Sequence, residues 1–179
     1  MRQLHRETTG ILLGALLLIL LAGCSHIYRK QYVLPDDSTP EIAYEGYTIK
    51  LGLQSRLAGY MGSENLFYLY IETSYPGDYD SSIIATPTEL IRFDSVCIQP
   101  MSTTDLTCLN LIDKYEVLDN YYQRAAYLTR HQFDGLTLGK REVFVTVSYV
   151  VEVLDPQTLT TAHRKRFQHE LRRKAHRTQ

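Results

Sequence analysis

A run of β-branched residues near the end of the chain constrains the fold most. Residues 142–154 read EVFVTVSYVVEVL, and apolar side chains occupy both faces at the centre of the run. This pattern is typical of a central strand covered on both sides. Apolar and polar residues alternate in residues 47–54 and 67–72, which predicts two further strands with one buried face each. The chain is therefore expected to fold around a β-sheet.

Shorter segments extend this pattern. Residues 90–99 predict a strand, and residues 106–112 are expected to pair with it. Weaker candidates are 115–118, 121–128 and 133–138, with a helix as the alternative for 120–129. After the turn at 155–158, the C-terminal segment reads as a strand or as a thin helical stripe formed by Phe167, Leu171 and Ala175. The strand is favoured, because a strand that enters a tight turn usually returns as a hairpin.

These strands predict an all-β fold, an antiparallel immunoglobulin-like sandwich of about seven or eight strands. The Trp and the inter-sheet cysteine pair of antibody domains are absent, so only the architecture is implied. Pro and Asp residues interrupt any periodicity in residues 25–40. The expected organisation is an N-terminal segment at 1–23, a tether at 24–40 and a β domain at 41–179.

The N-terminus has the features of a processing signal. Arg2 and Arg6 precede the apolar residues 10–21, and the run ends in Leu21-Ala22-Gly23-Cys24. This ending resembles the lipobox of bacterial lipoproteins. The resemblance implies cleavage before Cys24 and attachment of a diacylglyceryl group and an amide-linked acyl chain, such as palmitate, to that cysteine. Two or more acyl chains anchor a protein stably.

Two other interpretations of the N-terminus are less consistent with it. Residues 8–25 carry no charge, so their length suits an uncleaved transmembrane anchor, but such an anchor does not need the Ala-Gly-Cys ending. Gly10, Gly14 and Gly23 would weaken a cytoplasmic core helix. Ser25, in place of Asp after the cysteine, implies by the same resemblance the outer membrane, facing the periplasm, in a Gram-negative cell.

Charge excludes a globally basic nucleic-acid binder. Removing two arginines and one glutamate with residues 1–23 leaves 17 Lys and Arg against 19 Asp and Glu, a formal charge of −2. The distribution is uneven, since residues 163–177 carry +6 and residues 25–162 carry −8. The basic segment is expected to act through charge, either on its own acidic body or on an anionic partner.

Two cysteines, Cys97 and Cys108, remain after Cys24. An even number in an exported domain predicts a disulfide, here across a turn that contains Pro100. The alternatives are a metal pair and a catalytic thiol. No second cysteine pair and no neighbouring histidine supports either of them.

The sequence offers little sign of catalysis or of a cofactor. His163, His169 and His176 lie among basic residues at spacings that match no zinc motif, so no metal site is expected. The known nucleophile and phosphate-loop motifs are absent. The spacing of Glu64, Asp78, Asp80 and Asp94 does not favour a glycosidase pair.

Fourteen tyrosines and no tryptophan remain to be explained. Tyr68, Tyr70, Tyr75 and Tyr79 cluster in sequence and suggest a binding surface, although Tyr is also simply a good strand residue. The leading hypothesis is a non-enzymatic, lipid-anchored protein of the cell envelope that binds a protein partner. A glycan- or peptidoglycan-binding module is the second hypothesis, and an enzyme is the third.

Overall fold

The structure, a computed structural model, describes residues 28–55, 66–76, 85–119, 126–139 and 142–177. These residues form strands and no helix, so the all-β prediction is confirmed. In this part of the chain, no helix is long and apolar enough to cross a membrane. The strands are β1 (Tyr28–Val33), β2 (Glu41–Tyr44), β3 (Tyr47–Ser55), β4 (Leu66–Pro76), β5 (Ile91–Pro100), β6 (Thr107–Cys108), β7 (Leu111–Asp119), β8 (Ala126–Thr137), β9 (Phe144–Leu154) and β10 (Thr161–Arg177).

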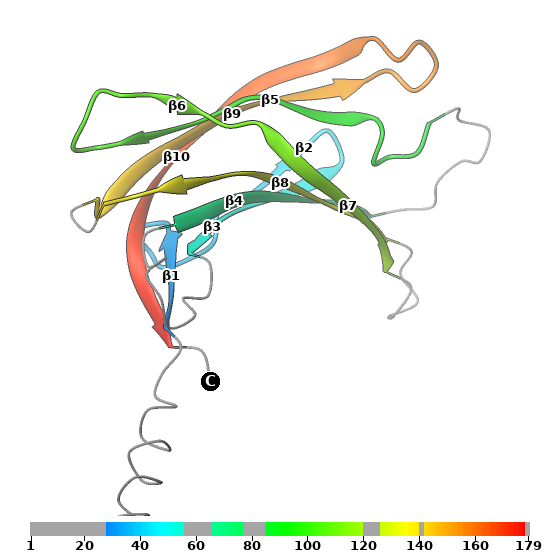
Figure 1. Ribbon diagram of the computed structural model, residues 1–179. Coiled ribbons are helices and arrows are strands. Elements are labelled where there is room, and N and C mark those ends of the chain that lie inside the picture. Colours follow the sequence, from blue (N-terminus) through cyan, green and yellow to red (C-terminus); the bar gives the residue numbers. More distant parts are fainter. Residues whose placement is uncertain (1–27, 56–65, 77–84, 120–125, 140–141, 178–179) are drawn as a thin grey trace, which may run out of the picture.

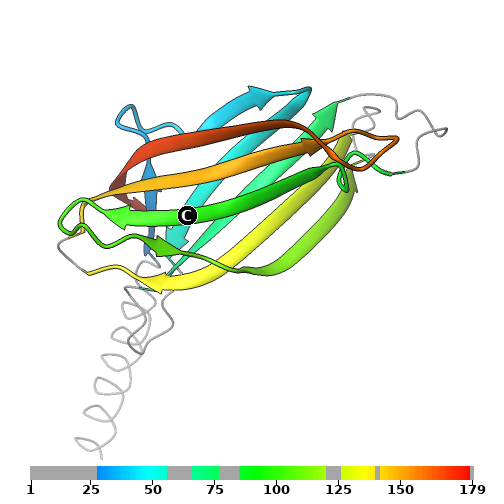
Figure 2. The ribbon, with the colours of Figure 1, turned by 90° about the horizontal axis from the view of Figure 1, so that it is seen from above.

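All ten strands of the described residues belong to one antiparallel sheet. Its order is β6–β5–β9–β10–β1–β3–β4–β8–β7, and β2 pairs with β3. The sheet curls into a sandwich-like arrangement, with β5, β6 and β9 above β3, β4 and β8, and the long β10 passes from one layer to the other (Figure 1). Seen from above, β9 runs between β5 and β10, as expected for a central strand (Figure 2).

The core follows from the alternation in the sequence. In β4, Phe67, Leu69 and Ile71 are fully buried, while Tyr68 and Tyr70 between them are half-buried on the opposite face. Val145, Val147 and Val151 of β9 complete the same core from the other layer. Every second side chain of each strand therefore points into a shared interior, as the sequence predicts.

The cysteine pairing predicted from the sequence is present. Cys97 of β5 lies opposite Cys108 of β6, and a disulfide joins them. The hairpin around them is shorter than expected, because only Thr107 and Cys108 pair with β5. The chain then crosses to β8 through a crossing segment, Leu109 and Asn110 (Figure 1). The Leu109 amide donates to Val96 O at 2.8 Å, and Asn110 O accepts from the Asp134 amide at 2.9 Å.

Strand β1 corrects the predicted tether. Residues 24–40 were expected to be a spacer, yet Tyr28–Val33 pairs with β10 along its whole length and with β3 at Gln31 and Tyr32. Tyr32 and Val33 are buried, which stabilises this pairing. The folded domain therefore includes residues 28–33, well before the expected boundary at residue 41.

The C-terminal segment is a strand, as favoured. β10 pairs with β9 over Thr161–Arg172 and with β1 over Arg172–Arg177, so the helical alternative is excluded there. The alternative helix at 120–129 is also wrong for its second part, because residues 126–129 belong to β8. Residues 120–125 lie outside the described residues.

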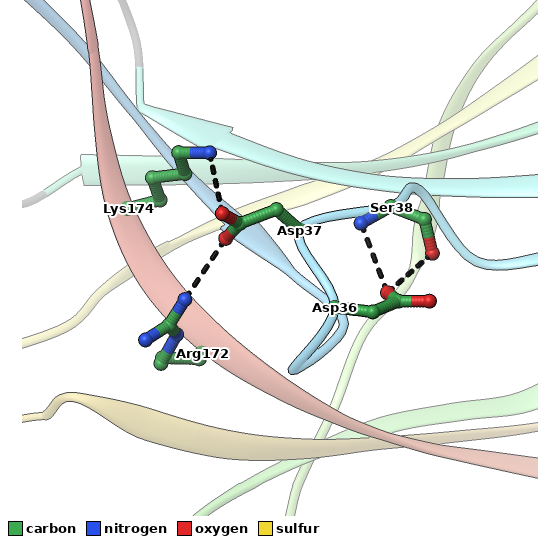
Figure 3. A network of polar contacts seen from close by, with 5 residues as sticks. All are labelled: Asp36, Asp37, Ser38, Arg172 and Lys174. Atoms are coloured by element: carbon green, nitrogen blue, oxygen red, sulfur yellow. Dashed lines mark hydrogen bonds and ion pairs between the residues drawn. The ribbon is translucent and has the colours of Figure 1, made fainter.

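A polar clamp holds the turn after β1 against β10 (Figure 3). The Asp37 carboxylate binds Arg172 at 2.9 Å and Lys174 at 2.8 Å. Hydrogen bonds from Lys174 and Arg172 hold the pKa of the Asp37 carboxyl below its usual value. Asp36 shapes the same turn by accepting hydrogen bonds from the amide and hydroxyl of Ser38. Part of the basic segment is thus bound to its own acidic body.

Candidate functional site

The best candidate site is a cleft where β5 and β8 face each other without pairing. It encloses about 570 Å³, within the usual range for ligand pockets. We call it the seam cleft. Its lining comes from β5, β7, β8, the end of β9, the turn before β10 and the segment before β5: Ala85, Glu89, Ile91, Arg92, Phe93, Leu111, Lys114, His131, Phe133, Leu154 and Leu159.

Aromatic side chains form the inner wall of the seam cleft. The Phe93 ring lies 4.9 Å from the His131 ring and 6.1 Å from the Tyr149 ring, measured between centroids. Tyr149 stacks on His169 of β10, and its hydroxyl lies 3.1 Å from His169 Nε2. Burial raises the pKa of the Tyr149 hydroxyl and lowers the pKa of the His169 imidazole. Both groups are thereby favoured in their neutral forms.

Charged groups of both signs lie at the rim. Lys114 Nζ donates to the Thr88 carbonyl at 3.2 Å, which fixes this ammonium beside the cleft. The Glu89 carboxylate accepts hydrogen bonds from the amide and hydroxyl of Thr86, and these bonds hold its pKa below the usual value. Arg92 is exposed at the start of β5. An apolar floor with charged edges suits a ligand that is partly apolar and partly polar.

Acid should destabilise the domain partly through His169. Because burial lowers the folded-state pKa of His169, the unfolded chain binds this proton more readily. His169 therefore lowers the free energy of unfolding at pH values below the unfolded-state pKa of about 6.5, and it has no such effect above that pH. We expect His169→Gln to flatten the fall of melting temperature between about pH 6.5 and 5. The control is His163→Gln, at an exposed position of the same strand, and an equal flattening there would contradict this role.

The tyrosines predicted to form a binding surface do not share one face. Tyr68 and Tyr70 are half-buried on the outer face of β4. The Tyr75 ring instead packs on Tyr47, at 5.1 Å between centroids, and belongs to the inner face. Tyr79 lies outside the described residues. The cluster in the sequence is therefore split by the alternation of the strand.

Tyr68 and Tyr70 cover glycines of the neighbouring strands. Tyr70 lies opposite Gly52, where an added Cβ would meet the Tyr70 ring at 2.0 Å. Its hydroxyl accepts a hydrogen bond from Gln54 Nε2 at 2.7 Å, and the Arg130 guanidinium lies 4.5 Å from the ring centroid. Tyr68 lies over Gly135 in the same way. These contacts give the two rings a structural role on the sheet surface.

The other groups considered in the sequence lie apart. His163 lies 3.6 Å from Glu45, whereas His169 lies at Tyr149 and His176 is opposite Arg29 in the ladder. Among the described residues, no three His, Cys, Asp or Glu side chains are grouped as metal ligands. Asp94 binds Arg164 at 3.1 Å. Cys24 and the other weighed carboxylates, Glu64, Asp78 and Asp80, lie outside the described residues.

The residues of the seam cleft were not found by sequence reasoning. Phe93 and His131 come from strands that are not paired with each other. Leu111 and Leu159 are large apolar side chains that remain 52% and 45% exposed, which only the folded structure reveals. In the sequence, these residues appear only as part of the apolar pattern of the strands. That pattern indicates a buried core and does not distinguish core residues from those of a cleft.

Comparison of the chain with protein-family models, with curated proteins and with solved structures finds no match.

Proposed function

We propose that this protein is a non-enzymatic lipoprotein of the cell envelope that binds a protein partner. The observation that carries the proposal is Leu21-Ala22-Gly23-Cys24 at the end of a short apolar run, directly before a β domain. Acylated Cys24 would hold the domain on a membrane, and in a Gram-negative cell the domain would face the periplasm from the outer membrane. The membrane lipid is thus the first partner, and the seam cleft is the site for the second.

Strand β1, which follows Cys24 in the chain, and the seam cleft lie at opposite ends of β10. Tyr28, four residues after Cys24, pairs with Arg177 at the end of β10, whereas Leu159 of the cleft comes just before the start of β10. A strand of this length has a contour of roughly 50 Å. Figure 1 shows the two ends of β10 far apart, with β1 beside the C-terminal one. A domain anchored at β1 would therefore present the cleft away from the membrane.

The edge of β5 favours a protein segment as the ligand. Residues 91–94 pair with β9, and among the described strands none pairs with their other edge. Such an edge binds an extended peptide by adding it to the sheet. Leu111 and Leu159 provide apolar contacts beside it, and Arg92 and Lys114 provide positive charge. An extended, partly acidic segment of an envelope protein fits this combination.

The glycan alternative rested on the tyrosine cluster. Because Tyr75 faces inward and Tyr68 and Tyr70 cover glycines, these side chains provide no common sugar-binding platform. A glycan in the seam cleft is therefore an outcome to be tested and not a second proposal.

Site-specific photocrosslinking in native membranes tests the partner. A photoreactive residue at Leu159 should capture one discrete protein, whereas one at Val143, which is equally exposed, should not. In the same experiment, Arg92→Glu should reduce capture at Leu159 about tenfold, since it would set a negative charge against an acidic partner segment, and like charges facing each other across an interface are costly.

Three results would contradict a protein ligand. Capture at Leu159 that equals capture at Val143 would indicate random collisions. An unchanged crosslinking yield at Leu159 in the Arg92→Glu variant would show that the edge of β5 does not contribute to binding of the partner. Saturable binding of peptidoglycan fragments, blocked by Leu159→Asp, would assign the cleft to a glycan.

A further inference from the structure

The paired ends of β1 and β10 form a basic ribbon that projects from the sheet. We call residues 28–31 and 174–177 the terminal ribbon. Among the described strands, residues 28–30 pair only with 175–177, so no third strand covers them. The ribbon contains Arg29, Lys30, Lys174 and Arg177 together with His176, and it contains no Asp or Glu.

One acidic residue, Asp37, binds the base of the ribbon. Asp37 binds Lys174 at 2.8 Å and shares its carboxylate with Arg172, which lies just outside the ribbon (Figure 3). Arg29, Lys30 and Arg177 lie further along the ladder, towards the tip. The sequence therefore places three basic residues and no acidic one in the part of the ribbon at which the chain enters the domain.

The base of the ribbon is fixed to the body of the domain. The Arg173 guanidinium packs 5.3 Å from the Tyr32 ring centroid and 5.1 Å from that of Phe67, and it donates to Gly139 O at 2.9 Å. Tyr32 in turn packs edge-on against Phe67 in the core. Together with the clamp at Asp37, these contacts set the direction of the ribbon relative to the sheet.

The chain length brings the ribbon close to the predicted anchor. Tyr28 lies four positions after Cys24, and this span is at most about 14 Å when fully extended. Charges within a Debye length of a membrane, about 8 Å at physiological ionic strength, attract anionic headgroups. An acylated Cys24 would keep Tyr28 within about 14 Å of the lipid, so the tip of the ribbon comes within a Debye length of the headgroups unless this span is fully extended.

We propose that the terminal ribbon is a membrane-docking surface that binds the anionic lipid headgroups of the bilayer in which Cys24 is anchored. The proposal rests on the proposed function for the position of that bilayer. Docking through the ribbon would orient the domain, so that the seam cleft at the other end of β10 points away from the lipid.

The test uses the full chain in two forms, with liposomes of phosphatidylcholine alone or with 30% phosphatidylglycerol as probes. The first form carries Cys24→Ser, so it has no acyl chain. Its apolar residues 10–21 remain and contribute to binding of both kinds of liposome, so the ribbon is measured by the difference between anionic and neutral binding. We expect it to bind the anionic liposomes more tightly than the neutral ones. Arg29→Gln, Lys30→Gln and Arg177→Gln should each weaken anionic binding about fivefold, and the three together about 100-fold, without affecting neutral liposomes.

The matched control removes the same charge at the other end of β10. Arg164→Gln, Lys165→Gln and Arg166→Gln should together change binding less than threefold, and the cooperative thermal transition should confirm that every variant is folded. Equal losses in the two triple variants, or no preference for anionic lipid, would overturn the proposal. If the triple ribbon variant does not fold, the single variants Arg29→Gln, Lys30→Gln and Arg177→Gln are compared with Arg164→Gln, Lys165→Gln and Arg166→Gln one by one.

The second form is the protein recovered from membranes, with its acylation established by intact mass. In anionic liposomes, amide exchange in residues 28–33 should be slower than in neutral ones, and the difference should shrink as salt rises. If the protein is acylated but amide exchange is the same in both liposomes, the proposed docking by the ribbon is overturned and the lipoprotein assignment stays intact. The reverse result, anionic binding by the first form with no acyl mass at Cys24, would overturn the lipoprotein assignment alone.

Discussion

Replacing Cys24 with Ser should abolish lipid attachment and leave the precursor uncleaved. The expected result is an intact mass without acyl chains and an N-terminus that still begins before residue 24. A serine hydroxyl is a poorer nucleophile than a thiolate, so it is not expected to take the lipid. Each buried methylene of a chain contributes about 0.8 kcal/mol to membrane binding, so the loss of two or more chains is the largest effect expected for any single substitution.

Membrane fractionation by itself would be a poor readout for this variant. The apolar residues 10–21 remain in an uncleaved chain and can keep it in a membrane without any lipid. Mass and N-terminal sequence separate the two cases. The control is the double variant Cys97→Ala/Cys108→Ala, which should still be acylated at Cys24. A wild-type protein that carries no acyl mass at Cys24 would refute the assignment.

The fold was predictable where burial imposes a pattern on the sequence. Residues 67–72 and 142–154 alternate or remain apolar because one or both faces of β4 and β9 are covered by the core. The cysteine pair was predictable because the turn between Cys97 and Cys108 is short.

Strand β1 was not predictable in the same way. Its sequence YRKQYV includes the polar run Arg29-Lys30-Gln31, and of the side chains described, those of Gln31, Tyr32 and Val33, the last two are buried. Its partner β10 lies more than 130 residues later in the chain, so no local pattern indicates the pairing. The pairing also depends on long-range contacts such as Asp37 with Arg172.

The candidate site was harder to predict than the fold, for two reasons. Even-numbered and odd-numbered residues of β4 face opposite sides of the sheet. Tyr68 and Tyr70 therefore lie on one face and Tyr75 on the other, although the three residues are close in sequence. The seam cleft, by contrast, depends on which strands fail to pair. Phe93, Leu111 and His131 meet there because β5 and β8 face each other across the crossing segment, and single segments of sequence carry no sign of this.

Removing the disulfide should destabilise the domain and loosen the crossing segment that follows it. Cys97 and Cys108 are 11 residues apart, and closing a loop of this size contributes about 3 kcal/mol in the chain-entropy model. For a domain of this size, we expect Cys97→Ala/Cys108→Ala to lower the melting temperature by about 6 to 12 °C. Reducing the wild type should lower it to the same value, and the reductant should leave the variant unchanged.

The local consequence follows from the position of the bridge. The disulfide ends β6 immediately before the crossing segment, whose Leu109 amide binds Val96 O and whose Asn110 carbonyl binds the Asp134 amide. These two hydrogen bonds tie the crossing segment to β5 and to β8, and Cys108, Leu109 and Asp134 line a second cavity next to the bridge. Amide exchange at Leu109 and Asp134 should therefore accelerate in the variant more than exchange at the centre of β9. Uniform acceleration of exchange across the domain would show that the bridge acts only on global stability. In a separate measurement, two freely alkylated thiols in the folded, oxidised wild type would show that the bridge is absent.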